Sequence, residues 1–168
     1  MIACRRGAVH DVAKLLDFGL VHDHQLDGGD DKLTLQGAVL GSPPYISPEQ
    51  ARGRGHVDGR SDIYSVGGLA YYLVTGQSPF VRETVMELLA AHLHEPVMPP
   101  RQIRPELPHD LEEVILTCLR KDAAERFPSV AALDHALAQC ESADHWDTEQ
   151  AEAWWRGWDR DVAQMEVA

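Results

Sequence analysis

Hydrophobic residues follow helical spacing in three stretches of the chain. The stretch 63–74 is apolar on nearly every side, which is typical of a helix buried all round. The stretch 111–119 has apolar residues at i, i+3, i+4, i+7 and i+8, which predicts a helix with one buried face. Asp110 and Glu113 resemble a capping box at its start. The stretch 130–137 repeats the pattern and predicts one more helix.

The start of the chain has a different pattern. Residues 1–4 and 12–16 are predicted to be short strands, joined across Arg5-Arg6-Gly7, where glycine permits the chain to reverse. Residues 20–41 are polar and rich in glycine, which predicts a loop able to switch between ordered and disordered states. We therefore expect a mainly α-helical fold with one short β-hairpin.

The last segment, 141–168, differs in composition from the rest. It has eight acidic and two basic residues, a net charge of −6, and it holds all four tryptophans. One face at helical spacing is formed by Trp154, Trp158, Val162 and Met165. Asp147 and Gln150 are placed like a helix cap, so we expect one helix with an aromatic stripe.

Three interpretations of this acidic tail remain open. The stripe can pack onto the rest of the protein, or the helix can dock a partner through Trp154, Trp155 and Trp158, since tryptophan is common at interface hot spots. The segment can also be a linker to a further domain.

Two short motifs enclose the polar loop. Asp17-Phe18-Gly19 precedes it, and residues 41–49, GSPPYISPE, follow it. The second motif resembles the G-[ST]-P-x-Y-x-[AS]-P-E stretch of Ser/Thr protein kinases and lacks the tryptophan usual in tyrosine kinases. Segment 17–49 is thus similar to a kinase activation segment, with serine and threonine as the implied acceptors.

Three later motifs appear in the order of the same family. Residues 61–67 (SDIYSVG) are similar to the start of the long central helix of the kinase C-terminal lobe, and residues 75–80 (TGQSPF) to its end. Residues 121–127 (KDAAERF) resemble the turn before the last lobe helix. The resemblance covers residues 1–140 and implies the C-terminal lobe of a bacterial-type Ser/Thr protein kinase.

This resemblance implies roles for individual residues. Asp17 would bind the magnesium that bridges the ATP phosphates, and Phe18 would pack inward to set the active geometry. Structural roles are implied for Asp62, which would hold the catalytic loop, for Gly67, and for Arg126, which would pair with Glu49.

The substrate-docking stretch is implied to comprise Gly41, Ser42, Pro43 and Tyr45. The Ser42 hydroxyl would contact the catalytic aspartate and help to select Ser/Thr acceptors. Thr34 is the only Ser or Thr between Gly19 and Gly41, so it is the candidate phosphosite, with an ordinary loop threonine as the alternative.

The motifs that complete a kinase active site are not in the sequence. It has no Gly-rich loop, no strand lysine of the V-A-I-K type and no H-R-D catalytic loop. Lys14 is too close to Asp17 to be the ATP lysine. We expect the N-terminal lobe to be absent, Met1 to be internal to a longer reading frame, and the isolated chain to be inactive, with ATP and Mg²⁺ serving the full-length parent.

The implied partners are a protein substrate or the missing N-terminal lobe. A rival interpretation is a stand-alone pseudokinase-like module that binds a protein. A generic acidic helical interaction protein fits the composition but leaves the order of the motifs unexplained. If the chain is the C-terminal lobe of a kinase, part of the helix 63–74 should face water. Asp62 should then be a partly buried carboxylate without partners.

Composition narrows the remaining functions. The 168 residues suit one cytoplasmic domain, and the net charge of −12 argues against nucleic-acid binding. Cysteines at 4, 118 and 140 have no metal or disulfide spacing, so we expect reduced thiols in or near the core. The apolar stretch 63–74 is too short to span a membrane. Histidines 22 and 24 are interpreted as solvated, and histidines 92 and 94 as residues late in a surface helix.

Overall fold

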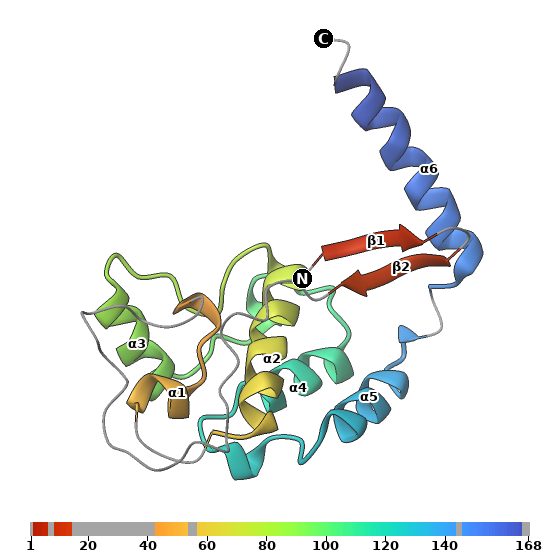
Figure 1. Cartoon of the computed structure of the whole chain (residues 1–168). Helices are drawn as coiled ribbons and strands as arrows, with labels where there is room; N and C mark the ends of the chain where they lie inside the picture. The colour runs from red at the N-terminus through yellow and green to blue at the C-terminus, as the bar shows by residue number, and fades with distance from the viewer. Residues whose placement is uncertain (1, 7–8, 15–42, 54–56, 144–145, 166–168) are drawn as a thin grey trace, which may run out of the picture. The chain divides into compact units, whose positions relative to one another are not determined.

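The chain is divided into two compact units in a computed structural model that describes residues 2–6, 9–14, 43–53, 57–143 and 146–165 (Figure 1). One unit combines Met1–Leu26 with Ser142–Ala168, and the other is Asp27–Glu141. Each unit is described by itself below.

The first unit contains a β-hairpin and a helix. Strands β1 (Ile2–Arg6) and β2 (Val9–Lys14) pair in antiparallel fashion, with Ile2 opposite Lys14 and Cys4 opposite Val12. The expected hairpin is therefore present, although its second strand begins at Val9 and not at Val12. Helix α6 (Thr148–Met165) lies beside β2.

A capping box fixes the start of α6, as the sequence indicated. The Gln150 N–H donates to Asp147 Oδ1 at 2.9 Å, and the Asp147 N–H donates to Gln150 Oε1 at 2.9 Å. These bonds satisfy two backbone donors that the first turn of a helix would otherwise leave unpaired.

The regular elements in the described part of the second unit are all α-helices or 3₁₀ turns. Its elements in chain order are the 3₁₀ turn η2 (Pro43–Tyr45), α1 (Pro48–Arg52), α2 (Gly59–Thr75), α3 (Val85–His94), η3 (Pro100–Gln102), α4 (His109–Cys118), η4 (Ala123–Glu125) and α5 (Val130–Ala138). This order agrees with the mainly helical fold expected from the sequence.

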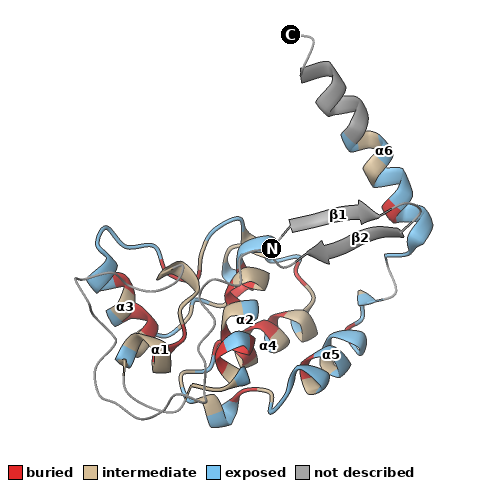
Figure 2. Ribbon diagram, viewed as in Figure 1, coloured by how far each residue is buried: buried red, intermediate tan, exposed pale blue. Residues whose placement is uncertain are grey.

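Helix α2 forms the centre of this unit (Figure 2). It begins after Asp58, whose carboxylate accepts the Arg60 N–H at 2.9 Å, and it ends at Gly76, which has a left-handed φ of 78°. Its core cluster joins side chains of α2 to α4 and the residue after it: Tyr64, Tyr71, Ile115 and Leu119. A second cluster adds α5 and consists of Ile63, Cys118 and Leu133.

Gly67 allows the close approach of α2 and α4. A Cβ atom at this position would lie 2.5 Å from Cys118 Cβ, which is shorter than real Cβ contacts. The sulfur at this contact is buried, and burial raises the pKa of the Cys118 thiol to about 12. Cys118 and Cys140 are both free and buried, as expected, whereas Cys4 has no described side chain.

One side of α2 faces water. Leu73 is 70% exposed, and Val66 and Tyr72 are nearly half exposed. The prediction of a helix buried on all sides is therefore wrong. The prediction that part of its apolar surface faces water is confirmed. Asp62 is exposed as well, so the expectation of a partly buried carboxylate is wrong.

Two other local expectations need correction. Helix α4 has Pro108 as its N-cap residue, so Asp110 and Glu113 form no capping box. Asp110 instead accepts the N–H groups of Leu111 at 2.8 Å and Glu141 at 2.6 Å. In α5 only Leu133 of the expected apolar face is buried, because Val130 and Leu137 are exposed.

Candidate substrate-docking site

The structure describes only part of the site expected from the sequence. Asp17, Phe18, Gly19, Thr34, Gly41 and Ser42 lie outside the described residues. The described members are Pro43, Tyr45, Glu49, Asp62, Gly67 and Arg126. Those of the stretch 43–49 lie in η2 and α1, whereas Asp62 and Gly67 lie on α2.

The turn η2 rests on the middle of α2. The Ser65 hydroxyl donates to the Tyr45 carbonyl at 2.9 Å. A Cβ at Gly68 would lie 3.1 Å from Tyr45 Cδ1, so the missing side chain leaves room for the tyrosine ring. The end of the expected docking stretch is thus supported by α2 and is not a free loop.

Helix α1 holds Glu49 in its first turn. Ser47 is its N-cap, and the Ser47 N–H donates to Gln50 Oε1 at 3.0 Å in a capping box. Pro48 occupies the first helical position, where its missing N–H costs no hydrogen bond. Helix α1 ends at Gly53, which has a left-handed φ of 68°.

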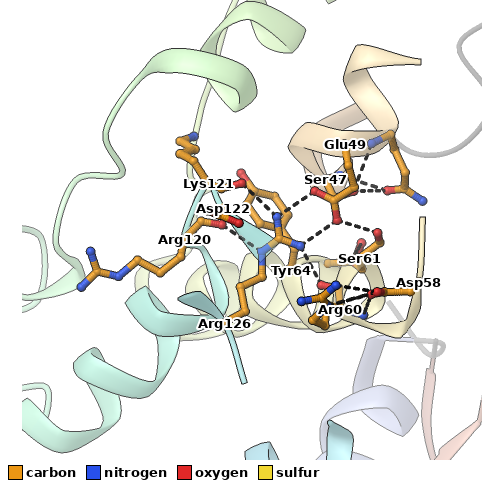
Figure 3. A network of polar contacts seen from close by, with 12 residues as sticks. Ser47, Glu49, Asp58, Arg60, Ser61, Tyr64, Arg120, Lys121, Asp122 and Arg126 are labelled. Atoms are coloured by element: carbon orange, nitrogen blue, oxygen red, sulfur yellow. Dashed lines mark hydrogen bonds and ion pairs between the residues drawn. The ribbon is translucent and has the colours of Figure 1, made fainter. Parts of the chain in front are cut away.

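Glu49 forms a bidentate ion pair with Arg126, at 2.7 Å between Nη1 and Oε1 and 2.8 Å between Nη2 and Oε2 (Figure 3). The Ser61 hydroxyl also donates to Oε1, at 2.5 Å. The Arg126 side chain has no exposed surface, and that of Glu49 is 13% exposed. The pair expected from the sequence is therefore present, and both side chains are largely shielded from solvent.

Backbone carbonyls complete the surroundings of Arg126. The guanidinium donates to the carbonyls of Arg60 at 2.8 Å, Arg120 at 2.9 Å and Lys121 at 3.3 Å. Its central carbon lies 4.9 Å from the centroid of the Tyr64 ring, within the range of a cation–π contact. Arg126 thus connects α1, α2 and the turn after α4.

The surroundings of Glu49 stabilise its ionised form. Burial alone would raise the pKa of this carboxyl, but the hydrogen bonds from Arg126 and Ser61 outweigh it and lower the pKa to about 2. Glu49 therefore remains an anion throughout the physiological pH range.

His92, on α3, is a buried residue that the sequence interpretation placed on a surface. Its side chain is fully buried, its Nδ1 lies 2.9 Å from the Tyr64 hydroxyl, and its ring packs edge-on against Phe80. Burial, assisted by the nearby Lys121 charge, lowers the pKa of His92 to about 4. The helical spacing of Leu88, Ala91 and His92 on one buried face was the signal available in the sequence.

Lys121 lies beside the same cluster. Its ammonium donates to the carbonyls of Ala91 at 3.2 Å and His92 at 2.8 Å, and it lies 4.5 Å from the centroid of the Phe80 ring. Burial lowers the pKa of Lys121 to about 8. These contacts attach the end of α3 to the turn that contains Arg126.

The described residues offer no cluster of metal ligands. No group of three His, Cys, Asp or Glu side chains among them is placed to bind a metal ion, and Asp17 lies outside them. The part of the chain that the structure describes also has no helix long and apolar enough to cross a membrane. The contacts described above hold the stretch 43–49 against α2 and Arg126.

Comparison with known proteins identifies the family. The model of the protein kinase domain matches residues 4–138. Relatives include the serine/threonine-protein kinase Pkn1 of Myxococcus xanthus, 40% identical over 84% of this chain, and the DNA damage-responsive serine/threonine-protein kinase RqkA of Deinococcus radiodurans, 41% identical over 80%. The serine/threonine-protein kinase PknB of Mycobacterium tuberculosis is 32% identical over 80%.

The chain spans about a fifth of the length of these relatives, 20% of the first two and 21% of the third. The match confirms the expected fold class and accounts for the order of the motifs, which an unrelated acidic helical protein would not. The chain belongs to the protein kinase domain family and is related to bacterial serine/threonine-protein kinases.

Proposed function

We propose that this chain is the C-terminal-lobe portion of a protein that transfers the γ-phosphate of ATP to serine and threonine hydroxyls of other proteins. The observation that carries this proposal is the buried ion pair between Glu49 and Arg126, which joins the end of the activation segment to the turn before α5. The relatives of the chain reported above are serine/threonine-protein kinases by name. The use of ATP makes the cytoplasm its proposed location.

In this proposal the stretch around Pro43 and Tyr45 receives the protein substrate. Phosphoryl transfer depends on positioning, and a displacement of about 1 Å can cost on the order of a hundredfold in rate. A docking stretch must therefore be held in place. The Ser65 bond to the Tyr45 carbonyl and the ion pair at Glu49 supply that support from two sides.

The remaining roles follow the family motifs. Asp17 would hold magnesium, Phe18 would set the geometry beside it, and Ser42 would contribute to the choice of serine and threonine as acceptors. Thr34 is the proposed phosphosite in the loop between them.

Docking can be tested by the binding of a panel of Ser- and Thr-containing peptides to the 168-residue chain. Tyr45→Ala should weaken binding, because the ring beside Gly68 is then lost. Tyr72→Ala is the matched control, since that exposed tyrosine lies on the same helix that supports Tyr45. Equal weakening by both substitutions, or by neither, would contradict a docking role for the stretch.

We also propose that this chain alone transfers no phosphate. Asp17 supplies neither the carboxylate that positions the acceptor hydroxyl nor the groups that hold the triphosphate. The chain would be incubated with labelled ATP, Mg²⁺ and a generic protein substrate. Transfer above the blank that is abolished by Asp17→Asn would contradict this part of the proposal.

A stand-alone pseudokinase-like binding module is the second candidate. The exposed apolar side of α2, with Leu73 at 70%, was expected for the kinase portion, and such a module would instead use it to bind a partner. The coding DNA before Met1 separates the two candidates. An in-frame H-R-D-x-K-P-x-N motif supports the kinase, and an in-frame stop codon supports the module.

A further inference from the structure

His92, on α3, has one ring nitrogen without a hydrogen-bond partner. The side chain is fully buried, and its Nδ1 lies 2.9 Å from the Tyr64 hydroxyl. Its Nε2 has no hydrogen-bond partner among the residues that the structure describes. Leaving a buried polar atom unpaired is costly, so folded proteins contain few of them. Nε2 of His92 therefore calls for a specific explanation.

Tyr64 determines which ring nitrogen carries the proton. Burial raises the pKa of the Tyr64 hydroxyl well above its ordinary value, so the hydroxyl stays protonated. Its hydrogen-bond partner is Nδ1 of His92, so the hydroxyl donates and Nδ1 accepts. The ring is neutral near pH 7, because burial and the Lys121 charge lower the pKa of His92 to about 4. A neutral imidazole has one N–H, and here it lies on Nε2.

Pro44, in the middle of η2, offers an acceptor beside this ring. Burial and the Lys121 charge lower the pKa of His92, and the Pro44 carbonyl partly offsets them by acting on the ring as an acceptor. The contact falls outside hydrogen-bond geometry, since Nε2 has no partner. The carbonyl is therefore close to the ring without being bonded to it.

The neighbouring carbonyls of η2 already have donors. The Pro43 carbonyl accepts the Ile46 N–H at 3.4 Å, and the Tyr45 carbonyl accepts the Ser65 hydroxyl at 2.9 Å. Within the described residues the Pro44 carbonyl has no comparable donor. An unpaired donor of α3 and an unpaired acceptor of η2 thus lie close together, at a place where the two elements are in contact.

We propose that His92 is a positioning residue of the substrate-docking stretch, whose Nε2–H hydrogen-bonds the Pro44 carbonyl once a Ser- or Thr-containing peptide is docked. A peptide that brings η2 slightly closer to α3 pairs both atoms, so this arrangement of the stretch gains stability when the peptide binds. The bond adds a support from α3 to those from Ser65 and from the ion pair at Glu49. This role rests on the proposed function, which assigns the stretch to substrate binding.

Selective labelling makes both atoms observable by NMR. Pro44–Tyr45 is the one Pro–Tyr sequence in the chain, so ¹³C-carbonyl proline combined with ¹⁵N-tyrosine reports the Pro44 carbonyl alone. With ¹⁵N-histidine, the ring signals of His92 are identified by their loss in His92→Gln. Near pH 7 the free chain should show a protonated Nε2 and an unprotonated Nδ1. The tightest-binding peptide of the panel described above should shift the Nε2 and Pro44 carbonyl signals together.

Three variants test the role by peptide affinity. His92→Phe keeps a ring but has no N–H, so binding should weaken by about three- to tenfold, the loss expected for one hydrogen bond. His92→Gln keeps an amide donor near the place of Nε2 and should retain most of the affinity. His94→Phe is the matched control, since His94 is exposed on the same helix, and it should bind like the unaltered chain. Circular dichroism melts would establish that each variant is folded.

Two results would overturn this role. A proton on Nδ1 of His92 in the free chain would leave Nε2 with no hydrogen to donate. Binding weakened by Tyr45→Ala but not by His92→Phe, with the Pro44 carbonyl signal unmoved by peptide, would keep the docking function and remove His92 from it. Failure of every peptide to bind the unaltered chain would instead refute the docking function itself, and this role with it. If His92→Phe does not fold, the labelled signals of the unaltered chain decide.

Discussion

Replacement of Arg126 by methionine should destabilise the protein strongly. Methionine retains most of the buried aliphatic volume but removes the guanidinium. The carboxylate of Glu49 then remains largely buried, with only the Ser61 hydroxyl as a side-chain donor. The carbonyls of Arg60 and Arg120 also lose their donor from Arg126.

The size of the effect follows from these contacts. Breaking a buried ion pair by removing one partner typically costs about 3–5 kcal/mol, because the other charge stays buried without compensation. A domain of this size has only about 5–15 kcal/mol of stability. We therefore expect Arg126→Met to lower the free energy of unfolding by about 3 kcal/mol or more.

Urea unfolding followed by circular dichroism would measure this change. Arg104→Met is the matched control, because Arg104 pairs with Glu106 at 2.9 Å but both side chains are more than half exposed. An exposed pair contributes at most about 1 kcal/mol. The combined variant Glu49→Gln/Arg126→Met should lose less than the sum of its single changes. If Arg126→Met unfolded at the same urea concentration as the control, the pair would not stabilise the fold.

Further predictions concern packing and pH. Gly67→Ala should destabilise by about 1–3 kcal/mol, because its Cβ meets Cys118, whereas Gly59→Ala, with open space around it, should be neutral or stabilising in the same urea assay. Stability should fall by about 2 kcal/mol from pH 7 to pH 5, since unfolding lets His92 bind a proton between its ordinary pKa of 6.5 and its folded pKa of about 4. His92→Gln should flatten that slope in pH-dependent melts, and an unchanged slope would contradict the assignment. Glu49 should contribute a further loss of at most about 3 kcal/mol as the pH falls from 4.5 through about 2, measured as the difference in acid dependence between His92→Gln and His92→Gln/Glu49→Gln.

Family motifs and local periodicity predicted the parts of the fold that depend on nearby residues. The pairing of Asp147 with Gln150 spans three residues, so the sequence alone indicated it. The pair of Glu49 and Arg126 is distant in sequence, but both residues belong to motifs with a fixed place in the kinase family. Spacing alone would not have joined them.

Tertiary contacts explain the failures. Asp110 was expected to cap its own helix, but its carboxylate binds the N–H of Glu141, 31 residues away. His92 was interpreted as a residue late in a surface helix, whereas Tyr64 and Phe80 pack against its ring. Which side of α2 is buried also depends on α4 and η2, and periodicity of an apolar segment does not distinguish its faces.

The position of Arg126 in the chain has a kinetic consequence. It meets Glu49 across 77 residues, and it also binds carbonyls at Arg60 and Arg120. This contact can form only after the central helix and the turn after α4 are in place, so it should be absent from the folding transition state. Losing it would then barely slow folding but would speed unfolding on the order of a hundredfold. Arg126 would determine how long the folded chain lasts, and not how fast it forms.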